Sequence, residues 1–299
     1  MENNEMITLN VTPKSKQVDR EKAIRTVILV ITYVMLTVGA IILVFPYLWM
    51  FLTSFKTRPE TNGSLTLKLF PEKFVTAAYS ELWAKVPFLS GVKNTLIIEF
   101  SVIIVGTFVA TMAAFSFAKL KLRHKNFWLL FLMSGMMVPY AALMLPQYRA
   151  FQALNMTNTL WPLILPGFFG NISMMFFLIQ YMKGISNSFF EAAKIDGASE
   201  MKQFLVIMLP LVKTAIAAQV IFWFIGIWND FFAPEIYLDD KEKMTLQPLL
   251  QRINTDNSGG GNYPVIMAGA VLASIPMMVI YITCQKFFIE SLAISGVKG

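Results

Sequence analysis

The sequence predicts an all-α integral membrane protein with six transmembrane helices. Of its 299 residues, 56% are hydrophobic and only 14% are charged, and the mean hydropathy is +0.58. These values exclude a disordered chain and favour a membrane protein over a soluble one. The chain also contains several long apolar runs, and a helix needs about 20 apolar residues to cross a bilayer. Composition and run length together give the fold class.

The first apolar run, residues 27–52, follows a polar tail at 1–26. We interpret it as an uncleaved first span, because it is too long for the apolar core of a signal peptide. Acidic residues also interrupt the positive region before it. A polar extracytoplasmic loop follows at 53–93, and residues 75–83 within it are predicted to form a short surface helix.

The other five spans lie within residues 94–290, and residues 291–299 form a cytoplasmic C-terminal tail. The predicted spans are residues 95–120, 127–146, 160–182, 204–229 and 264–288. Small residues in the second span suit close helix packing. Prolines in the later spans predict kinks.

Positive charges predict the orientation of the chain. Lys and Arg residues gather in the N-terminal tail and between Lys119 and Lys125, and such clusters mark the cytoplasmic side. Both termini of a six-span chain are then cytoplasmic. The loop at 53–93 carries six Lys and Arg residues on the outside, but long loops weigh less in this rule. The net charge of +7 follows from the same rule, so we expect contact with membrane lipid and none with nucleic acid.

The stretch from Ser188 to Pro210, SFFEAAKIDGASEMKQFLVIMLP, is too polar and too broken to cross a membrane. Ser188 and Glu191 fit a capping box at the start of a helix. Gly197 suits a left-handed stop after about two turns, and Ser199 can cap a second helix that enters the bilayer. The sequence therefore predicts a short capped helix that lies flat at the membrane between two spans.

This stretch resembles the EAA loop of permease subunits in binding-protein-dependent ABC importers. The resemblance is closest to oligosaccharide importers of the maltose type and covers the chain from about Asn94 to the C-terminus. The matching residues are Glu191, Ala192, Ala193, Asp196, Gly197, Ala198, Phe204, Ile207, Leu209 and Pro210. Such permeases often carry a further proline a few residues later, whereas Thr214 follows Lys213 here. This departure concerns a second kink and not the loop itself.

The resemblance implies a type I ABC importer permease fold and one half of a translocation path for a di- or oligosaccharide. It implies four kinds of protein or substrate partner: a second homologous permease subunit, two cytoplasmic ATP-binding subunits, an extracytoplasmic solute-binding protein and the sugar. It also places the chain in the bacterial cytoplasmic membrane. The residues that the resemblance assigns to ATPase coupling are Glu191, Ala192, Ala193, Asp196, Gly197, Ala198, Leu209 and Pro210.

No catalytic or cofactor site is expected on this chain. The sequence has no G-x-x-x-x-G-K-[ST] motif, so ATP and Mg²⁺ are expected on the partner ATPase. The single histidine, His124, and the single cysteine, Cys284, offer no metal-binding spacing. We therefore expect no enzyme activity, no cofactor and no metal here.

Polar residues inside the spans are candidates for the substrate path, because each is costly in lipid. Several share one face of the fifth span at helical spacing. Amide, carboxylate and aromatic groups bind sugar hydroxyls and ring faces, although helix–helix hydrogen bonding and an interfacial aromatic belt explain any single residue as well. The candidate path residues are Asn171, Gln219, Trp223, Asn229 and Asp230.

Two charged residues lie inside predicted spans. Glu99 is about one turn into the second span, and either a structural role or a place in the path fits it. Lys213 is about one turn into the fifth span, where its long stem can reach the interface. The alternative function is a secondary transporter or channel subunit for a small polar solute, which would place coupling charges near the midplane. A membrane enzyme is a further alternative, but it needs a convergent catalytic set that the sequence does not offer.

Overall fold

The structure is a computed structural model that describes residues 14–62, 68–255 and 261–296. The chain divides into two compact units, residues 1–52 and 53–299. The described part of the first unit belongs to a single helix, α1 (Lys14–Thr53), which contains the predicted first span. Its apolar side chains are exposed along its length within that unit, from Val27 to Leu48. A helix that is apolar all round suits a lipid environment.

All regular secondary structure in the described part of the second unit is helical. Its elements are α2 (Arg58–Asn62), α3 (Ala77–Lys85), α4 (Phe88–Lys119), α5 (Lys125–Gly135), α6 (Tyr140–Ala153), α7 (Trp161–Phe168), α8 (Ile172–Lys183), α9 (Ser188–Ile195), α10 (Glu200–Lys202), a π-helical segment (Gln203–Met208), α11 (Leu209–Trp228), α12 (Phe232–Tyr237), α13 (Leu246–Thr255) and α14 (Tyr263–Gly296). Among the described residues, five helices are long and apolar enough to cross a membrane, or six if α5 and α6 form one bent span.

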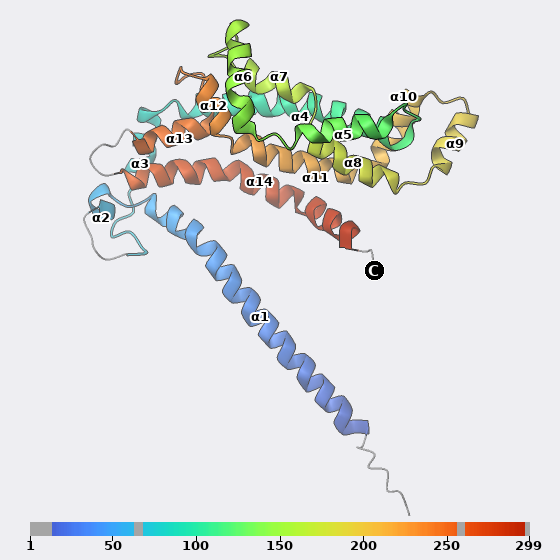
Figure 1. Ribbon diagram of the computed structural model, residues 1–299. Helices are drawn as coiled ribbons and strands as arrows, with labels where there is room; N and C mark the ends of the chain where they lie inside the picture. The colour runs from blue at the N-terminus through green and yellow to red at the C-terminus, as the bar shows by residue number, and fades with distance from the viewer. Residues whose placement is uncertain (1–13, 63–67, 256–260, 297–299) are drawn as a thin grey trace, which may run out of the picture. The chain divides into compact units, whose positions relative to one another are not determined.

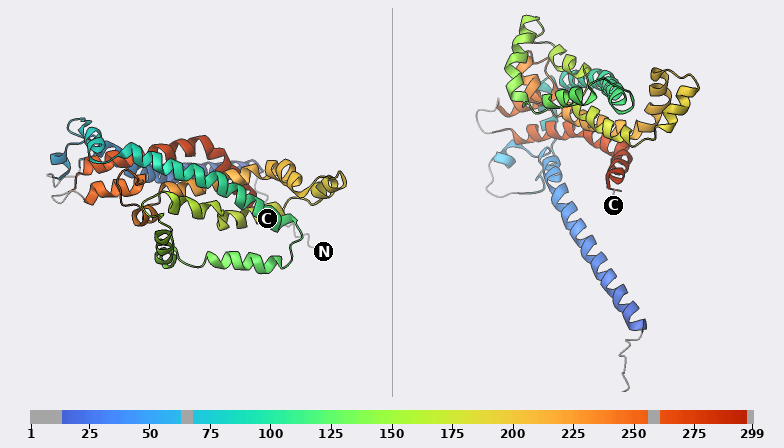
Figure 2. Two further views of the ribbon diagram at one scale, coloured as in Figure 1. Left: turned by 90° about the horizontal axis from the view of Figure 1, so that it is seen from above. Right: turned by 45° about the vertical axis from the view of Figure 1, so that its right-hand side comes forward.

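Helix α4 is the centre of the second unit. It contacts α7, α8, α11 and α13, and α11 in turn lies between α4 and α14 (Figure 1). The short helices α9 and α10 stand at one end of this bundle, and α3, α12 and α13 gather at the other end (Figures 1 and 2). Helix α4 therefore connects the two ends of the bundle.

Glycines allow α4 to lie close to its neighbours. A Cβ atom at Gly106 would overlap the carbonyl oxygen of Gly167 on α7 and the indole of Trp223 on α11. A Cβ atom at Gly167 would lie 2.5 Å from Val102 Cγ1 on α4. The backbones of α4 and α7 thus meet directly, as small residues permit in membrane helices.

The predicted third span, residues 127–146, is wrong as a single helix. The structure has α5 and α6 instead, with an angle of 89° between them. Pro139 is the N-cap of α6 in an extended conformation. Proline lacks an N–H group and disfavours helical geometry in the residue before it, so the helix breaks at this point.

The predicted fourth span, residues 160–182, also contains a break. Helix α7 ends at Phe168 and α8 begins at Ile172. Between them, Gly170 has φ of +89° and packs against the backbone of Ala110 on α4. A side chain is strained at this φ, so glycine suits the position.

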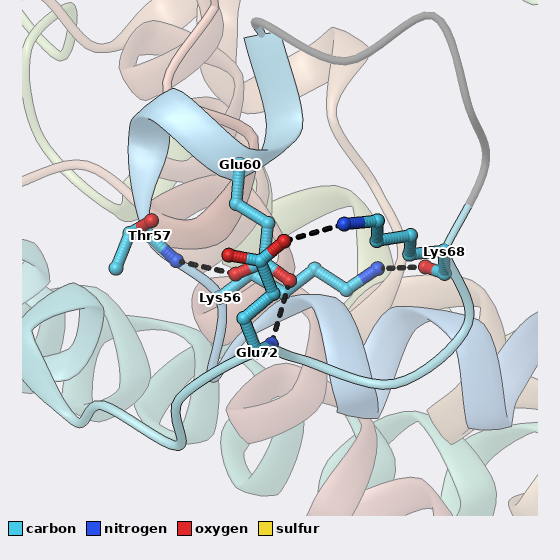
Figure 3. Close-up of polar contacts among 5 residues, drawn as sticks. All are labelled: Lys56, Thr57, Glu60, Lys68 and Glu72. Carbon is cyan, nitrogen blue, oxygen red and sulfur yellow. Dashed lines mark hydrogen bonds and ion pairs between the residues drawn. The ribbon is translucent and has the colours of Figure 1, made fainter.

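Polar contacts join the described residues 56–60 and 68–72 of the loop after the first span (Figure 3). The Glu60 carboxylate accepts hydrogen bonds from the backbone N–H groups of Thr57 (3.5 Å) and Glu72 (2.9 Å). Lys56 Nζ donates to the carbonyl of Lys68, and Lys68 pairs with the Glu72 carboxylate. The predicted surface helix at 75–83 appears two residues later, as α3 (Ala77–Lys85).

The two chain ends differ from the predicted tails. Helix α14 continues through Gly296, so residues 291–296 are helical. At the N-terminus, α1 already begins at Lys14 within the predicted tail. The rest of both predicted tails, residues 1–13 and 297–299, lies outside the described residues.

We predict that Gly106→Ala destabilises the protein by about 1–3 kcal/mol, because overpacking a close contact has this cost. The added methyl group would meet the backbone of α7 and the indole of Trp223. Gly226→Ala on α11 is the matched control, since a Cβ atom there has nothing within 4 Å. Thermal unfolding in detergent measures both. Equal melting temperatures for the two variants would contradict the packing argument.

Candidate functional site

The segment Ser188–Pro210, hereafter the 188–210 loop, begins with α9. The predicted capping box of Ser188 and Glu191 is wrong. Asn187 is the N-cap residue, and Ser188 is already the first residue of the helix. From that position the Ser188 hydroxyl pairs with Ser186 Oγ at 2.8 Å. Glu191 lies in the first turn of α9, where the positive end of the helix dipole stabilises a carboxylate.

The predicted turn after α9 is confirmed. Gly197 has φ of +75°, and a Cβ atom at this position would meet no heavy atom within 4 Å. Ser199 caps α10 by accepting a hydrogen bond from the N–H of Lys202 at 3.3 Å. Gln203 Nε2 donates to the carbonyl of Ala198 at 2.8 Å, which ties the turn to the next segment.

The second helix of the 188–210 loop is not one regular helix. Three residues of α10 pass into the π-helical segment Gln203–Met208 before α11 starts. The N–H of Leu209 bonds to the carbonyl of Phe204, five residues back. Pro210 has no N–H group and cannot donate a helical backbone hydrogen bond. Such π-helical turns are rare and often occur at functional sites.

The surface of the 188–210 loop combines apolar, small and acidic groups. Phe189 and Ile195 are 54% and 87% exposed, whereas Phe190 is buried against α4. The predicted coupling residues are mostly exposed. Those exposed are Glu191, Ala192, Asp196, Gly197 and Pro210, and those half-buried are Ala193, Ala198 and Leu209. Exposed apolar side chains beside small residues are typical of a protein–protein contact surface.

A cavity of about 310 Å³ lies farther along the bundle, beside α4 and α11; we name it the α4–α11 cavity. Apolar walls dominate it, and an indole and several polar side chains face it. Its lining residues are Thr95, Ile98, Val102, Tyr140, Gln147, Pro162, Leu163, Pro166, Gly167, Trp223, Ile227, Asp230, Ala233, Pro234 and Thr245. Apolar cavities with a few polar groups are the usual form of small-molecule sites.

The structure brings two of the five predicted path residues into this cavity, Trp223 and Asp230. Gln219 is half-buried one turn earlier on α11 and is not among the lining residues. Asn229 is exposed, and its Nδ2 donates to the carbonyl of Ile225 at 2.8 Å. Asn171 caps α8, since its Oδ1 accepts from the N–H of Met174 at 3.0 Å.

Sequence reasoning missed the polar lining residues outside α11. Tyr140 and Gln147 come from α6, Thr95 from α4 and Thr245 from the turn before α13. Tyr140 and Gln147 are seven residues apart, a spacing that puts both on one helical face. This spacing is visible in the sequence, but a straight third span ending at residue 146 assigns Tyr140 and Gln147 to different elements.

Asp230 combines a structural contact with its place at the cavity. Its Oδ1 accepts from the N–H groups of Phe232 (3.0 Å) and Ala233 (3.2 Å), so it satisfies the first donors of α12. Burial raises the pKa of this carboxyl above its usual value, and the two N–H donors partly oppose that rise. The carboxyl group is therefore held in place in the wall of the cavity.

Glu99 lies farther from the start of its helix than the predicted span implies. Helix α4 begins at Phe88, so Glu99 is about three turns inside it rather than one. Its side chain is fully buried, and neither carboxyl oxygen has a hydrogen-bond partner among the described residues. Lys213 is exposed, as a side chain that reaches the interface would be. The described residues contain no group of three or more His, Cys, Asp or Glu residues that could hold a metal ion.

Comparisons with known proteins agree on one family. Residues 103–293 match the family described as binding-protein-dependent transport system inner membrane component. The arabinooligosaccharides transport system permease protein AraQ of Halalkalibacterium halodurans is 31% identical over 279 residues, covering 89% of this chain and 96% of that protein. The galactooligosaccharides transport system permease protein GanQ of Bacillus subtilis is 31% identical, covering 93% and 98%. The maltodextrin transport system permease protein MdxG of the same organism is 28% identical, covering 90% and 95%.

A solved structure also resembles this chain. It is a chain from the crystal structure of a bacterial ABC transporter involved in the import of the acidic polysaccharide alginate. The TM-score is 0.77 at 21% identity, and the match covers 94% of this chain and all of that chain. At this identity the likeness shows a shared fold, and it confirms the fold class expected from the sequence.

We predict that Asp230→Ala lowers the free energy of unfolding by about 1 kcal/mol, because the first two N–H groups of α12 lose their acceptor. Asp230→Asn keeps an acceptor oxygen at the same place and should retain that stability.

Burial raises the pKa of Asp230 in the folded protein, so the ionised carboxyl destabilises the fold as the pH rises above the unfolded pKa of about 3.9. The asparagine variant should lose this pH dependence. Melting temperatures between pH 4 and pH 8 measure both effects, and indistinguishable Ala and Asn variants would contradict the capping role.

Proposed function

Because the chain belongs to the family of binding-protein-dependent transport system inner membrane components, we propose that it forms half of the translocation path of an ATP-driven sugar importer. The family match carries this proposal, since residues 103–293 include both the 188–210 loop and most of the lining of the α4–α11 cavity. The other half of the path would come from a second, homologous permease subunit. A secondary transporter or channel is not favoured, because this family depends on a binding protein.

A di- or oligosaccharide is the proposed substrate class. The relatives named above transport arabinooligosaccharides, galactooligosaccharides and maltodextrins by their names. The α4–α11 cavity supports the same class, because Trp223 offers an aromatic face for an apolar sugar ring. Gln147, Tyr140 and Asp230 offer hydrogen-bonding groups for hydroxyls. An extracytoplasmic binding protein would deliver the sugar.

The 188–210 loop is the proposed contact with two cytoplasmic ATPases. Its exposed apolar side chains, Phe189 and Ile195, can enter a groove on another protein, and Ala192 and Gly197 allow a close approach. ATP and Mg²⁺ would bind to the ATPases, so this chain needs no nucleotide site. The loop and both termini would then face the cytoplasm of a bacterial cell, in agreement with the positive cluster from Lys119 to Lys125.

We predict that Gly197→Val uncouples ATP hydrolysis from transport without preventing membrane insertion. The φ of Gly197 is +75°. Valine is strained in this conformation, at a cost of about 1–3 kcal/mol, and the turn after α9 should change shape. Gly197→Asn is the matched control, because asparagine tolerates this conformation better. There is open space at the position, so the two variants differ mainly in backbone strain.

The measurement for Gly197 is sugar uptake and binding-protein-stimulated ATPase activity in the reconstituted complex. Uptake should fall strongly for Gly197→Val and remain near normal for Gly197→Asn, while the amount of assembled complex stays similar. Normal uptake by Gly197→Val would refute a coupling role for this turn.

We also predict that Gln147→Ala changes the KM for uptake or the preference among maltodextrins, arabinooligosaccharides and galactooligosaccharides. Gln147 lines the α4–α11 cavity, and loss of one hydrogen bond in such a site costs on the order of 1 kcal/mol. Gln152→Ala on the same helix is the control, because Gln152 is exposed and not among the lining residues. Identical sugar preferences in both variants would argue against a substrate role for the cavity.

A further inference from the structure

Lys119 joins the end of α4 to the start of the 188–210 loop. Its Nζ donates to the carbonyl of Ile185 at 2.6 Å and to Oδ1 of Asn187 at 2.8 Å. The same ammonium group lies 5.3 Å from the ring centroid of Phe190. This separation is within the range of a cation–π contact. One side chain of α4 therefore holds the N-cap residue of α9 and the residue that α9 buries.

A column of aromatic rings continues this contact along α4. Phe190 of α9 packs on Phe115 of α4, with ring centroids 5.9 Å apart. Phe115 also packs on Phe204 of the π-helical segment at 5.5 Å, and Phe204 on Phe108 of α4 at 5.9 Å. The positions 108, 115 and 119 recur at helical spacing, so they lie on one face of α4. Both helical parts of the loop are thus packed against that face.

Along the chain, irregular backbone lies on both sides of α9. Towards the N-terminus, α8 reaches α7 only through the break at Gly170 and Asn171. Towards the C-terminus, α11 follows the π-helical segment Gln203–Met208. Residues at the ends of elements are those that absorb changes of φ and ψ in hinge motions. Movement of α9 can therefore be taken up at either connection before it reaches the cavity.

Helix α4 has no such interruption. It is a single helix of 32 residues without an internal proline. At the usual rise of an α-helix this length corresponds to about 48 Å. Beyond the aromatic column, Gly106 lies against Trp223, and Thr95, Ile98 and Val102 line the α4–α11 cavity. One rigid element thus touches the 188–210 loop at one end and the cavity farther along.

We propose that α4 transmits movement of the 188–210 loop to the α4–α11 cavity, and that Lys119 is the positioning residue that fastens α4 to the loop. This inference rests on the proposed function of the loop and adds a route that does not follow the chain. It requires the two hydrogen bonds of Lys119 and its charge above Phe190, because these hold the loop against α4 when the loop moves.

The test uses the complete importer in liposomes, with Lys119→Met, Lys119→Arg and Lys121→Met in this chain. Methionine keeps an unbranched side chain and removes the charge and donors, whereas arginine restores both. Lys121 is exposed and lies two residues farther on, so Lys121→Met controls for the loss of one positive charge from this turn. The readouts are the amount of assembled complex and the ratio of maltodextrin, arabinooligosaccharide or galactooligosaccharide imported to ATP hydrolysed.

A second readout follows α4 directly. Spin labels at Leu89 on α4 and Tyr263 on α14, in a Cys284→Ser background, report the distance between the outer ends of the two helices with and without Mg-ATP. Both label positions are exposed. This distance responds to nucleotide binding by the ATPases, so the readout does not depend on the choice of sugar.

We expect Lys119→Met to lower the ratio of sugar imported to ATP hydrolysed about tenfold. Loss of one charge-assisted hydrogen bond changes an equilibrium constant by about this factor. Lys119→Met should also abolish the ATP-dependent distance change while the complex still assembles. Lys119→Arg should restore both readouts, and Lys121→Met should match the wild type. A wild-type ratio and a wild-type distance change in Lys119→Met would overturn the inference.

If Lys119→Met does not assemble, Asn187→Ala decides the question, because it removes one acceptor from the exposed start of α9. Reduced coupling in Asn187→Ala supports the inference, and unchanged coupling overturns it. Failure of the proposed function would show in the wild type itself, as an absence of ATP-driven uptake. Failure of the present inference would show only in the variants.

Discussion

The close packing of α4 against α7, α8 and α11 is the contact on which the rest of the second unit depends. Gly106 leaves room for the carbonyl of Gly167 on α7 and for the indole of Trp223 on α11. Gly170, between α7 and α8, lies against the backbone of Ala110 on α4. In a membrane, apolar side chains gain little by leaving lipid for protein, so close van der Waals contact must hold helices together. The glycines therefore determine the position of the Trp223 indole, which lines the α4–α11 cavity.

The same packing supports irregular backbone in and beside the candidate membrane spans. Helices α7 and α8 are separated by a break, and α11 follows a π-helical segment, yet free backbone groups are costly in lipid. Both irregularities lie against α4, where Ala110 meets Gly170 and Phe115 meets Phe204. A continuous helix thus supports two interrupted neighbours.

Local sequence signals were reliable where a single residue type decides the backbone. Gly197 and Ser199 behave as predicted, because a left-handed turn and a helix cap each depend on one side chain. The capping box at Ser188 failed because the helix starts one residue earlier than a cap at Ser188 requires. The third span failed because hydropathy alone does not show that Pro139 turns the chain by 89°.

The sequence by itself determined the membrane class, the presence of long apolar helices and the turn within the 188–210 loop. These follow from hydropathy and from short-range backbone preferences, which are local properties of the chain. Tertiary structure decided which polar residues meet. Thr95, Tyr140, Gln147 and Thr245 join Trp223 and Asp230 only because α6 turns at Pro139 and α4 packs closely on α7. Lys119 contacts Asn187 and Phe190 only in the folded protein, because residues far apart in the chain become neighbours when the helices pack.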